Sequence, residues 1–154
     1  MQELQRIADQ FAKLPPRKAA HGAKLVSYSE GVKIPLIVCG DFNAVPDSDV
    51  YHYMNEGFVP PDHPDLMGKK LCSKGMGHKL NLKSAYASIG GPPLTNYTPS
   101  FQEALDYTWY STSNATVTDV LSEVDDEYTS RVVGSLNAHF PSEYVLFVSF
   151  HPCY

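Results

Sequence analysis

The sequence has 154 residues, of which 43% are hydrophobic, 12% aromatic and 19% charged, and its formal net charge is −5 at pH 7. This size fits one domain, and the composition and charge exclude disordered, collagen-like and coiled-coil chains and a bulk polyanion-binding protein of the basic-patch type. The apolar runs are too short for a membrane helix, the first residues lack a signal-peptide pattern, and three widely spaced cysteines indicate a reduced compartment without structural zinc.

The sequence of the first third of the chain predicts a helix, a loop and a strand. Apolar residues at helical spacing predict an amphipathic helix over residues 2–14, which Pro15 and Pro16 end. Residues 17–33 show no periodicity and are expected to form a loop. The continuous apolar run Ile34–Gly40 has the length of a strand buried on both faces.

A short helix is predicted directly after that strand. The segment Val50–Glu56 follows Asp47 and Ser48, either of which can act as its N-cap. Gly57 is placed to end the helix.

The rest of the chain mixes short elements and turns, which indicates an α/β or α+β fold. Residues 58–80 show no clear element, residues 82–87 fit a short helix or strand, and 92–99 is turn-like. Strands are predicted over Leu105–Ser111, Val117–Leu121 and Glu143–Phe150, with one or two helical turns at 124–131.

Asp41 and Asn43 are the best local candidates for chemistry. They lie two residues apart on a tight turn that follows a predicted strand, where ligands gather in α/β sheets. A carboxylate can hold a metal or orient a water, and an amide can hold a phosphate oxygen or a base without adding charge. The alternative is a turn whose side chains cap the backbone.

Asp106 and Phe101 are the second pair of candidates. Asp106 heads an aromatic strand, where an acid must be solvated, paired or ligating, and the alternative is a strand-edge carboxylate in water. Phe101 can offer a stacking surface for a base, and the alternative is a loop aromatic packed into the core. The six histidines lack the spacing of a zinc site, and no phosphate-binding glycine motif occurs.

Several blocks of the sequence resemble one family in the same order along the chain. They are IPLIVCGDFNAVPDSDVYHYMNEG, HPDL, LKSAYASIG, LTNYTPSFQEALDYTWYS, LSEVDDEY and NAHFPSE. The chain resembles the catalytic deadenylase subunits of the carbon-catabolite-repression/NOT complex, most closely the fungal ones, within the endonuclease/exonuclease/phosphatase superfamily.

The resemblance implies a two-sheet α/β sandwich with helices outside and a Mg²⁺-dependent poly(A)-specific 3′–5′ exoribonuclease that releases 5′-AMP from messenger RNA. By position, Asp41 resembles the acid that orients the attacking water near the metal, and Asn43 the amide that contacts the scissile phosphate and the adenine. Phe101 resembles the aromatic that stacks on the terminal adenine, and Asp106 the acid that supports the catalytic histidine and the metal site. The implied partners are poly(A) RNA and the other subunits of the deadenylase complex, in cytoplasm and nucleus and without a membrane.

Two departures from the family pattern leave an alternative open. The family's Ser-Asp-His step before the last strand reads Ser142, Glu143 and Tyr144 here, and a phenol cannot replace an imidazolium beside a phosphate.

The chain, as a single domain over 1–154, resembles the second half of the nuclease domain, with a helix and loop over 1–33 and the best match over 34–150. The first half, with its magnesium-binding glutamate, and the leucine-rich-repeat docking segment are expected to be absent. The alternative is therefore an inactive fragment or degenerate copy that binds RNA or protein, and a half-sandwich is expected to expose an apolar face.

Overall fold

The computed structural model describes residues 1–15, 26–66, 73–91, 94–121, 127, 130–131, 134 and 148–153. These residues form a mixed α and β structure, as the element pattern predicts. The helices are α1 (Gln2–Ala12) and α2 (Asp49–Glu56), with single 3₁₀ turns η1 (Gly31–Lys33), η2 (Pro64–Leu66) and η3 (Ala87–Ile89). The strands are β1 (Ile37–Asp41), β2 (Phe58–Val59), β3 (Met76–Gly77), β4 (Leu82–Ser84), β5 (Asn96–Tyr97), β6 (Gln102–Glu103), β7 (Asp106–Ser111), β8 (Ala115–Val120) and β9 (Val148–Pro152).

The short helix α2 ends where the sequence predicts and begins one residue earlier, at Asp49. Ser48 is the N-cap, and its Oγ accepts a hydrogen bond from the backbone N–H of Tyr51 at 3.2 Å. Gly57 follows the helix in the left-handed conformation, with φ 74°, which a glycine adopts without steric cost. Both ends of α2 are therefore set by local chemistry.

The centre of the fold is a three-stranded antiparallel sheet in the order β1-β7-β4. β7 lies between its two neighbours, with Val38 opposite Trp109 and Ser84 also opposite Trp109 on the other side. Being central, β7 is buried along nearly its whole length. This strand therefore anchors both β1 and β4, and with them the turn that follows β1.

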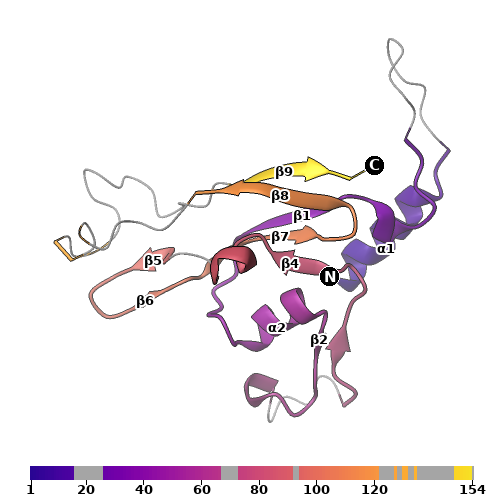
Figure 1. Cartoon of the computed structure of the whole chain (residues 1–154). Coiled ribbons are helices and arrows are strands. Elements are labelled where there is room, and N and C mark those ends of the chain that lie inside the picture. Colours follow the sequence, from indigo (N-terminus) through magenta and orange to yellow (C-terminus); the bar gives the residue numbers. More distant parts are fainter. Residues whose placement is uncertain are drawn as a thin grey trace.

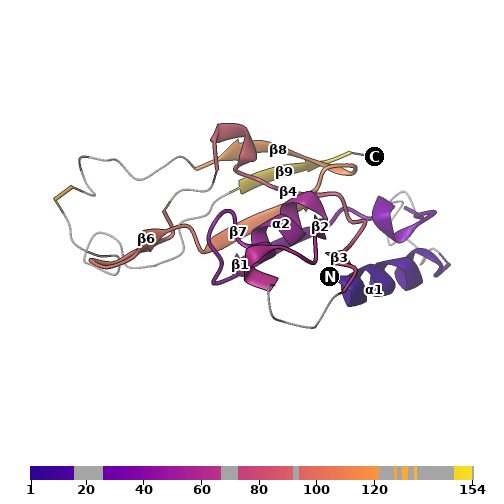
Figure 2. The ribbon, with the colours of Figure 1, turned by 90° about the horizontal axis from the view of Figure 1, so that it is seen from below.

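One face of the sheet packs on α2, which Figure 2 shows lying across β1 and β7. Trp109 and Tyr107 are the largest side chains buried there, with exposed fractions of 0% and 1%. They share a core cluster with Met54 of α2, and Tyr51 of α2 packs edge-on against both rings. The aromatic alternation of β7 thus accounts for one layer of the molecule.

The opposite face of the sheet is turned toward the ribbon β8–β9. Tyr110, which alternates with Trp109 along β7, lies 5.6 Å from the ring of Phe150 on β9, centroid to centroid. In Figure 1 the β8–β9 ribbon lies above the sheet and α2 lies below it, while the hairpin β5–β6 extends to one side. The site candidates are all found on or near the side of this sheet where β7 begins.

The expectation that β1 is buried on both faces is wrong. Four of its five residues are exposed, and Ile37 has an exposed fraction of 47%. β1 pairs only with β7 among the described strands, so it forms an edge, and Ile37 and Cys39 are exposed although they lie on the face that Tyr110 turns toward β9. Ile7 and Phe11 of α1 are also about half exposed.

Other sequence predictions changed in detail. The segment 82–87 forms a strand followed by a 3₁₀ turn, and the turn-like stretch 92–99 contains β5. Leu105–Ser111 and Val117–Leu121 are strands, as predicted, each with slightly shifted ends. Much of 124–131 and of Glu143–Phe150 lies outside the described residues, as does Cys72. Within the described part, Cys39 and Cys153 are free thiols, and no helix has the length and apolar character needed to cross a membrane.

Candidate active site

Asp41 and Asp106 lie directly opposite each other at the edge of the central sheet. Asp41 is the last residue of β1 and Asp106 the first of β7, and they are register partners. The N–H of Phe42 donates to the carbonyl oxygen of Leu105 at 2.9 Å, so this hydrogen bond flanks the aspartate pair rather than joining it. Residues paired in this way have Cα atoms about 4.5 Å apart and side chains on the same face.

Asp106 is buried, with an exposed fraction of 7%, so the alternative of a carboxylate in water at a strand edge is wrong. The physical reason is that β7 is the central strand of its sheet. Thr95 supports its backbone: the Thr95 Oγ1 accepts hydrogen bonds from the N–H of Leu105 at 2.8 Å and from the N–H of Asp106 at 3.0 Å. Asp41, across from it, is exposed.

The turn after β1 is held in an unusual backbone conformation. Gly40 has φ 154° and Asn43 has φ 47°, and both values are positive. The carboxylate Oδ1 of Asp41 accepts a hydrogen bond from the N–H of Asn43 at 2.7 Å, which closes an Asx turn. The capping role that the sequence left open is therefore confirmed, and it fixes the backbone of both polar candidates in one short loop.

Two aromatic residues beside the acids point into the core. Phe42 packs edge-on against Tyr107 and Trp109, with ring centroids 6.0 and 6.1 Å away. The hydroxyl of Tyr107 lies 2.7 Å from the carbonyl oxygen of Ala44 and 2.9 Å from that of Ala104. Burial raises the pKa of Tyr107, so its hydroxyl stays a neutral donor.

Sequence reasoning missed both Thr95 and Tyr107. The sequence does carry a signal for Tyr107, because it follows Asp106 in a predicted strand. Successive side chains of a strand point to opposite faces, so Tyr107 is turned toward the core, where a buried phenol needs a hydrogen-bond acceptor. Thr95 offers no comparable signal, since its two donors belong to residues ten and eleven positions further along the chain.

Phe101 lies at the tip of the hairpin β5–β6. Its N–H donates to Thr98 Oγ1 at 3.0 Å, and the N–H of Thr98 donates back to its carbonyl oxygen at 2.9 Å. The side chain is 41% exposed, so the alternative of a ring packed into the core is wrong. The tip lies three residues, or about 10 Å of strand, from the hairpin base at Ala104. The hairpin β5–β6 thus starts beside Asp106, but Phe101 at its tip does not lie next to the two aspartates.

The pair of aspartates offers carboxylate oxygens, the kind of ligand that divalent cations bind. Like charges directly opposite each other repel, and a hard cation bound by carboxylate oxygens removes that cost. In the part of the chain that the structure describes, no group of three or more His, Cys, Asp or Glu residues is close enough together to hold a metal. Glu143 and Tyr144, which depart from the family pattern, lie outside the described residues.

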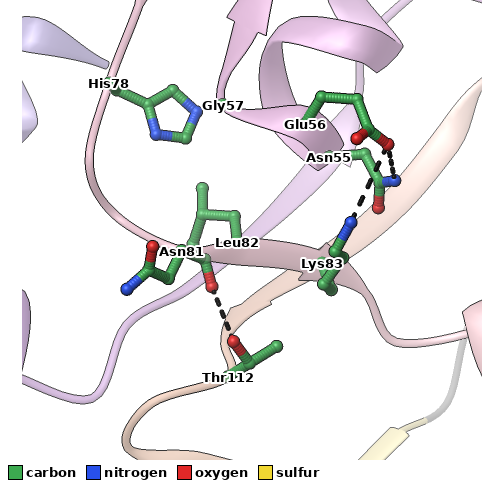
Figure 3. Close-up of a pocket in the computed structure, with 8 residues that line it drawn as sticks. All are labelled: Asn55, Glu56, Gly57, His78, Asn81, Leu82, Lys83 and Thr112. Carbon is green, nitrogen blue, oxygen red and sulfur yellow. Dashed lines mark hydrogen bonds and ion pairs between the residues drawn. The ribbon is translucent and has the colours of Figure 1, made fainter.

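A separate cavity of about 210 Å³ lies at the other end of the sheet (Figure 3). Its lining includes Glu56 and Lys83, which form an ion pair at 3.8 Å. Lys83 is opposite Tyr110 near the end of β7, whereas Asp106 begins that strand. Four residues of strand, about 13 Å, separate the two positions, so this cavity is not part of the aspartate site.

Comparison with known families and proteins gives a consistent result. The family described as the endonuclease/exonuclease/phosphatase family matches residues 8–131. The chain is 42% identical over 154 residues to the CCR4-Not complex 3′-5′-exoribonuclease subunit Ccr4 of Mycosarcoma maydis, covering 97% of this chain and 23% of that protein. The corresponding subunit of Coccidioides immitis (strain RS) is 40% identical, with 94% of this chain and 22% of that protein covered.

A solved structure with a similar fold is that of ANGEL2, described as a 2′,3′-cyclic phosphatase in complex with adenosine-2′,3′-vanadate. The TM-score is 0.59 at 20% sequence identity, and the match covers 96% of this chain and 50% of the other. The chain thus spans less than a quarter of these two curated relatives and half of this structural neighbour.

Proposed function

The chain belongs to the endonuclease/exonuclease/phosphatase family and is a homologue of the Ccr4 exoribonuclease subunits, and we propose that it is the second half of a poly(A)-specific 3′–5′ exoribonuclease. In this proposal it forms one half of a two-sheet sandwich, and the complete domain shortens messenger RNA tails and releases 5′-AMP. The observation that carries the proposal is the register pairing of Asp41 with Asp106 at one sheet edge, next to the Asn43 turn.

The proposed roles follow from where these side chains lie. Asp41 is exposed, so its carboxylate can reach a water molecule and orient it toward a phosphate. Asn43, fixed two residues later, can donate its amide to a phosphate oxygen or an adenine. Phe101, exposed on its hairpin, can stack on the terminal base. No covalent nucleophile is required, because positioning and charge stabilisation account for the chemistry.

Mg²⁺ is the proposed cofactor, and Asp41 and Asp106 are the residues that would hold it. When bound, such a cation stabilises the negative charge that develops on a phosphate oxygen and helps ionise a water. Two carboxylates are fewer ligands than Mg²⁺ requires, so further oxygens must come from substrate, water or the first half of the domain.

The proposed partners are poly(A) RNA and the other subunits of the deadenylase complex, in the nucleus and cytoplasm, where such RNA is found. The relatives at about 40% identity are subunits of the CCR4-Not complex. The supporting physical feature is the exposed Phe101, because base stacking on an aromatic ring is favourable for single-stranded RNA.

An inactive, RNA- or protein-binding chain is the second candidate. The observation that favours it is that the site has two candidate metal ligands, Asp41 and Asp106. The described residues offer no third His, Cys, Asp or Glu close enough to join them in binding a metal. Tyr144 at the position of the family's histidine points the same way, because a phenol ordinarily titrates near pH 10 and carries no positive charge in either form.

The two candidates are separated by measuring AMP release from an A-only oligonucleotide in Mg²⁺. Four proteins are compared: the chain, its Tyr144→His variant, and each of these joined to the first half of the nuclease domain of the Mycosarcoma maydis relative. Activity in a joined form that is lost on Asp106→Asn supports the exoribonuclease. Absence of AMP release from all four, with Mg²⁺ binding also absent by calorimetry, would establish the inactive alternative.

A further inference from the structure

The candidate site has two parts, the Asn43 turn and the segment that begins with Asp106. Tyr107 lies between these two parts, but its side chain does not face the site. It follows Asp106 in β7 and points to the opposite face of the sheet, where its ring is 1% exposed. The ring stacks on Trp109 at 5.1 Å and meets Tyr51 edge-on at 5.5 Å, centroid to centroid. Because aromatic neighbours fix the ring, the position of its hydroxyl is fixed as well.

That hydroxyl joins two backbone segments that are far apart in the sequence. It donates to the carbonyl oxygen of Ala44 at 2.7 Å and shares the hydrogen bond with the carbonyl oxygen of Ala104 at 2.9 Å. Both alanines are buried, with exposed fractions of 6% and 5%. A buried carbonyl without a partner is costly, so the phenol satisfies two backbone groups at once.

The two segments carry the proposed chemistry. Ala44 directly follows Asn43, and Ala104 is the base of the hairpin that bears Phe101 and leads to Asp106. On its N-terminal side the Asn43 turn is held by Asp41 Oδ1 and by the hydrogen bond from Phe42 to Leu105. The Tyr107 hydroxyl supplies the next anchor on the C-terminal side, so that Asn43 is fixed from both directions.

We propose that Tyr107 is a positioning residue whose hydroxyl fixes the Asn43 turn to the Asp106 segment. The effect of Tyr107 on catalysis rests on the proposed function, whereas the hydrogen bonds that fix the Asn43 turn do not depend on it. The phenol is buried on the opposite face of the sheet and acts through the backbone of Ala44. Misplacement of a site group by about 1 Å can lower a rate about 100-fold, so a single buried hydroxyl can matter at this distance from the chemistry.

The test replaces Tyr107 by Phe, which removes one oxygen and keeps the ring packing. The matched control is Tyr51→Phe, because Tyr51 packs against the same rings and its hydroxyl makes no hydrogen bond with the part of the chain that the structure describes. Hydrogen–deuterium exchange of residues 42–45 is measured in the full chain, with Trp109 fluorescence as a report on the ring cluster. We expect faster exchange in Tyr107→Phe only, with Trp109 emission unchanged in both variants.

The same variants are placed in the joined form that releases AMP. Tyr107→Phe is expected to lower kcat or Mg²⁺ affinity about 10- to 100-fold with KM nearly unchanged, as for groups that support a site from behind. Unchanged exchange at 42–45 overturns the proposal, and so does faster exchange with wild-type kcat and Mg²⁺ affinity. If no form is active, the proposed function fails on its own, and exchange at 42–45 still decides whether the hydroxyl anchors the turn.

A second measurement avoids dependence on the variant. In the unaltered chain, the hydroxyl proton of Tyr107 should give a slowly exchanging NMR signal with nuclear Overhauser contacts to residues 44 and 104. A rapidly exchanging hydroxyl, without such contacts, would contradict the proposed anchor even if Tyr107→Phe failed to fold.

Discussion

Thr95 holds Asp106 in place through the backbone. The Thr95 Oγ1 accepts hydrogen bonds from the N–H of Asp106 at 3.0 Å and from the N–H of the preceding Leu105 at 2.8 Å. Asp106 begins β7 without a backbone hydrogen bond across to its register partner Asp41, so its N–H needs another acceptor. A side chain from the Phe101 hairpin thus completes the end of the central sheet.

Replacing Thr95 by Val should destabilise the chain strongly. The side chain keeps its shape, but the buried N–H of Asp106 and the partly buried N–H of Leu105 lose their acceptor, at a cost of about 1–3 kcal/mol for the first and less for the second. We expect the free energy of unfolding to fall by about 2–4 kcal/mol in urea titrations followed by Trp109 fluorescence. Thr95→Ser keeps the oxygen and should remain within about 1 kcal/mol of wild type. Equal losses in both variants would mean that packing, rather than the hydroxyl, supports Asp106.

Gly40→Ala tests whether backbone conformation alone shapes the site turn. A Cβ at Gly40 would meet no heavy atom within 4 Å, yet the φ of 154° disfavours any L side chain. The loss in unfolding free energy should therefore be about 1–3 kcal/mol, caused by strain and not by collision. Cys39→Ala, one residue earlier on the exposed face, is the control and should change stability by less than about 0.5 kcal/mol. A neutral Gly40→Ala would show that the turn relaxes freely.

His78 should make stability fall in mild acid. Burial lowers the pKa of His78, against a smaller opposing contribution from the backbone of Tyr53, and its Nδ1 accepts a hydrogen bond from the N–H of Leu80 at 3.2 Å. Below the unfolded pKa of about 6.5 the unfolded chain binds a proton that the folded chain resists. The contribution is therefore fully present above pH 6.5 and is lost as the pH falls toward the lowered folded value.

His78→Asn provides the comparison for this pH dependence. Asparagine can accept the same hydrogen bond through Oδ1 but does not titrate. Urea titrations between pH 8 and pH 5 should show a shallower decrease in unfolding free energy for the variant than for the wild type. Parallel curves for the two proteins would assign the acid sensitivity to other groups.

The parts of the fold that the sequence predicts well depend on local chemistry. Ser48 and Gly57 delimit α2 because a hydroxyl next to free N–H groups and a residue without a Cβ act within one turn of the helix. The alternation of Tyr107 and Trp109 similarly identifies β7 and the face that packs on α2. The polar turn at Asp41 and Asn43 was also predictable, since its closing hydrogen bond spans only two residues.

The parts that it predicts poorly depend on partners distant in the sequence. An apolar run such as that of β1 gives the same pattern whether neighbouring strands cover it or leave it at an edge, so its burial was predicted wrongly. The burial of Asp106 depends on its strand being central, and its support by Thr95 depends on a hairpin closing. The pairing of Asp41 with Asp106 is a register, which no local pattern specifies.

The aspartate pair itself should behave as a site that costs stability until a cation binds. Two carboxylates directly opposite each other are unfavourable by a few tenths to about 1 kcal/mol. Asp41→Asn removes one charge and keeps the Oδ1 that accepts from the Asn43 N–H, so the Asx turn survives. Without added metal we expect this variant to melt about 1–3 °C higher than the wild type.

Mg²⁺ should raise the melting temperature of the wild type and leave that of Asp41→Asn unchanged, because binding stabilises only the form that holds the ion. Asp119→Asn, an exposed change on β8, should show neither effect. A lower melting temperature for Asp41→Asn without metal, or an equal response of both proteins to Mg²⁺, would mean that Asp41 serves the turn and not a cation.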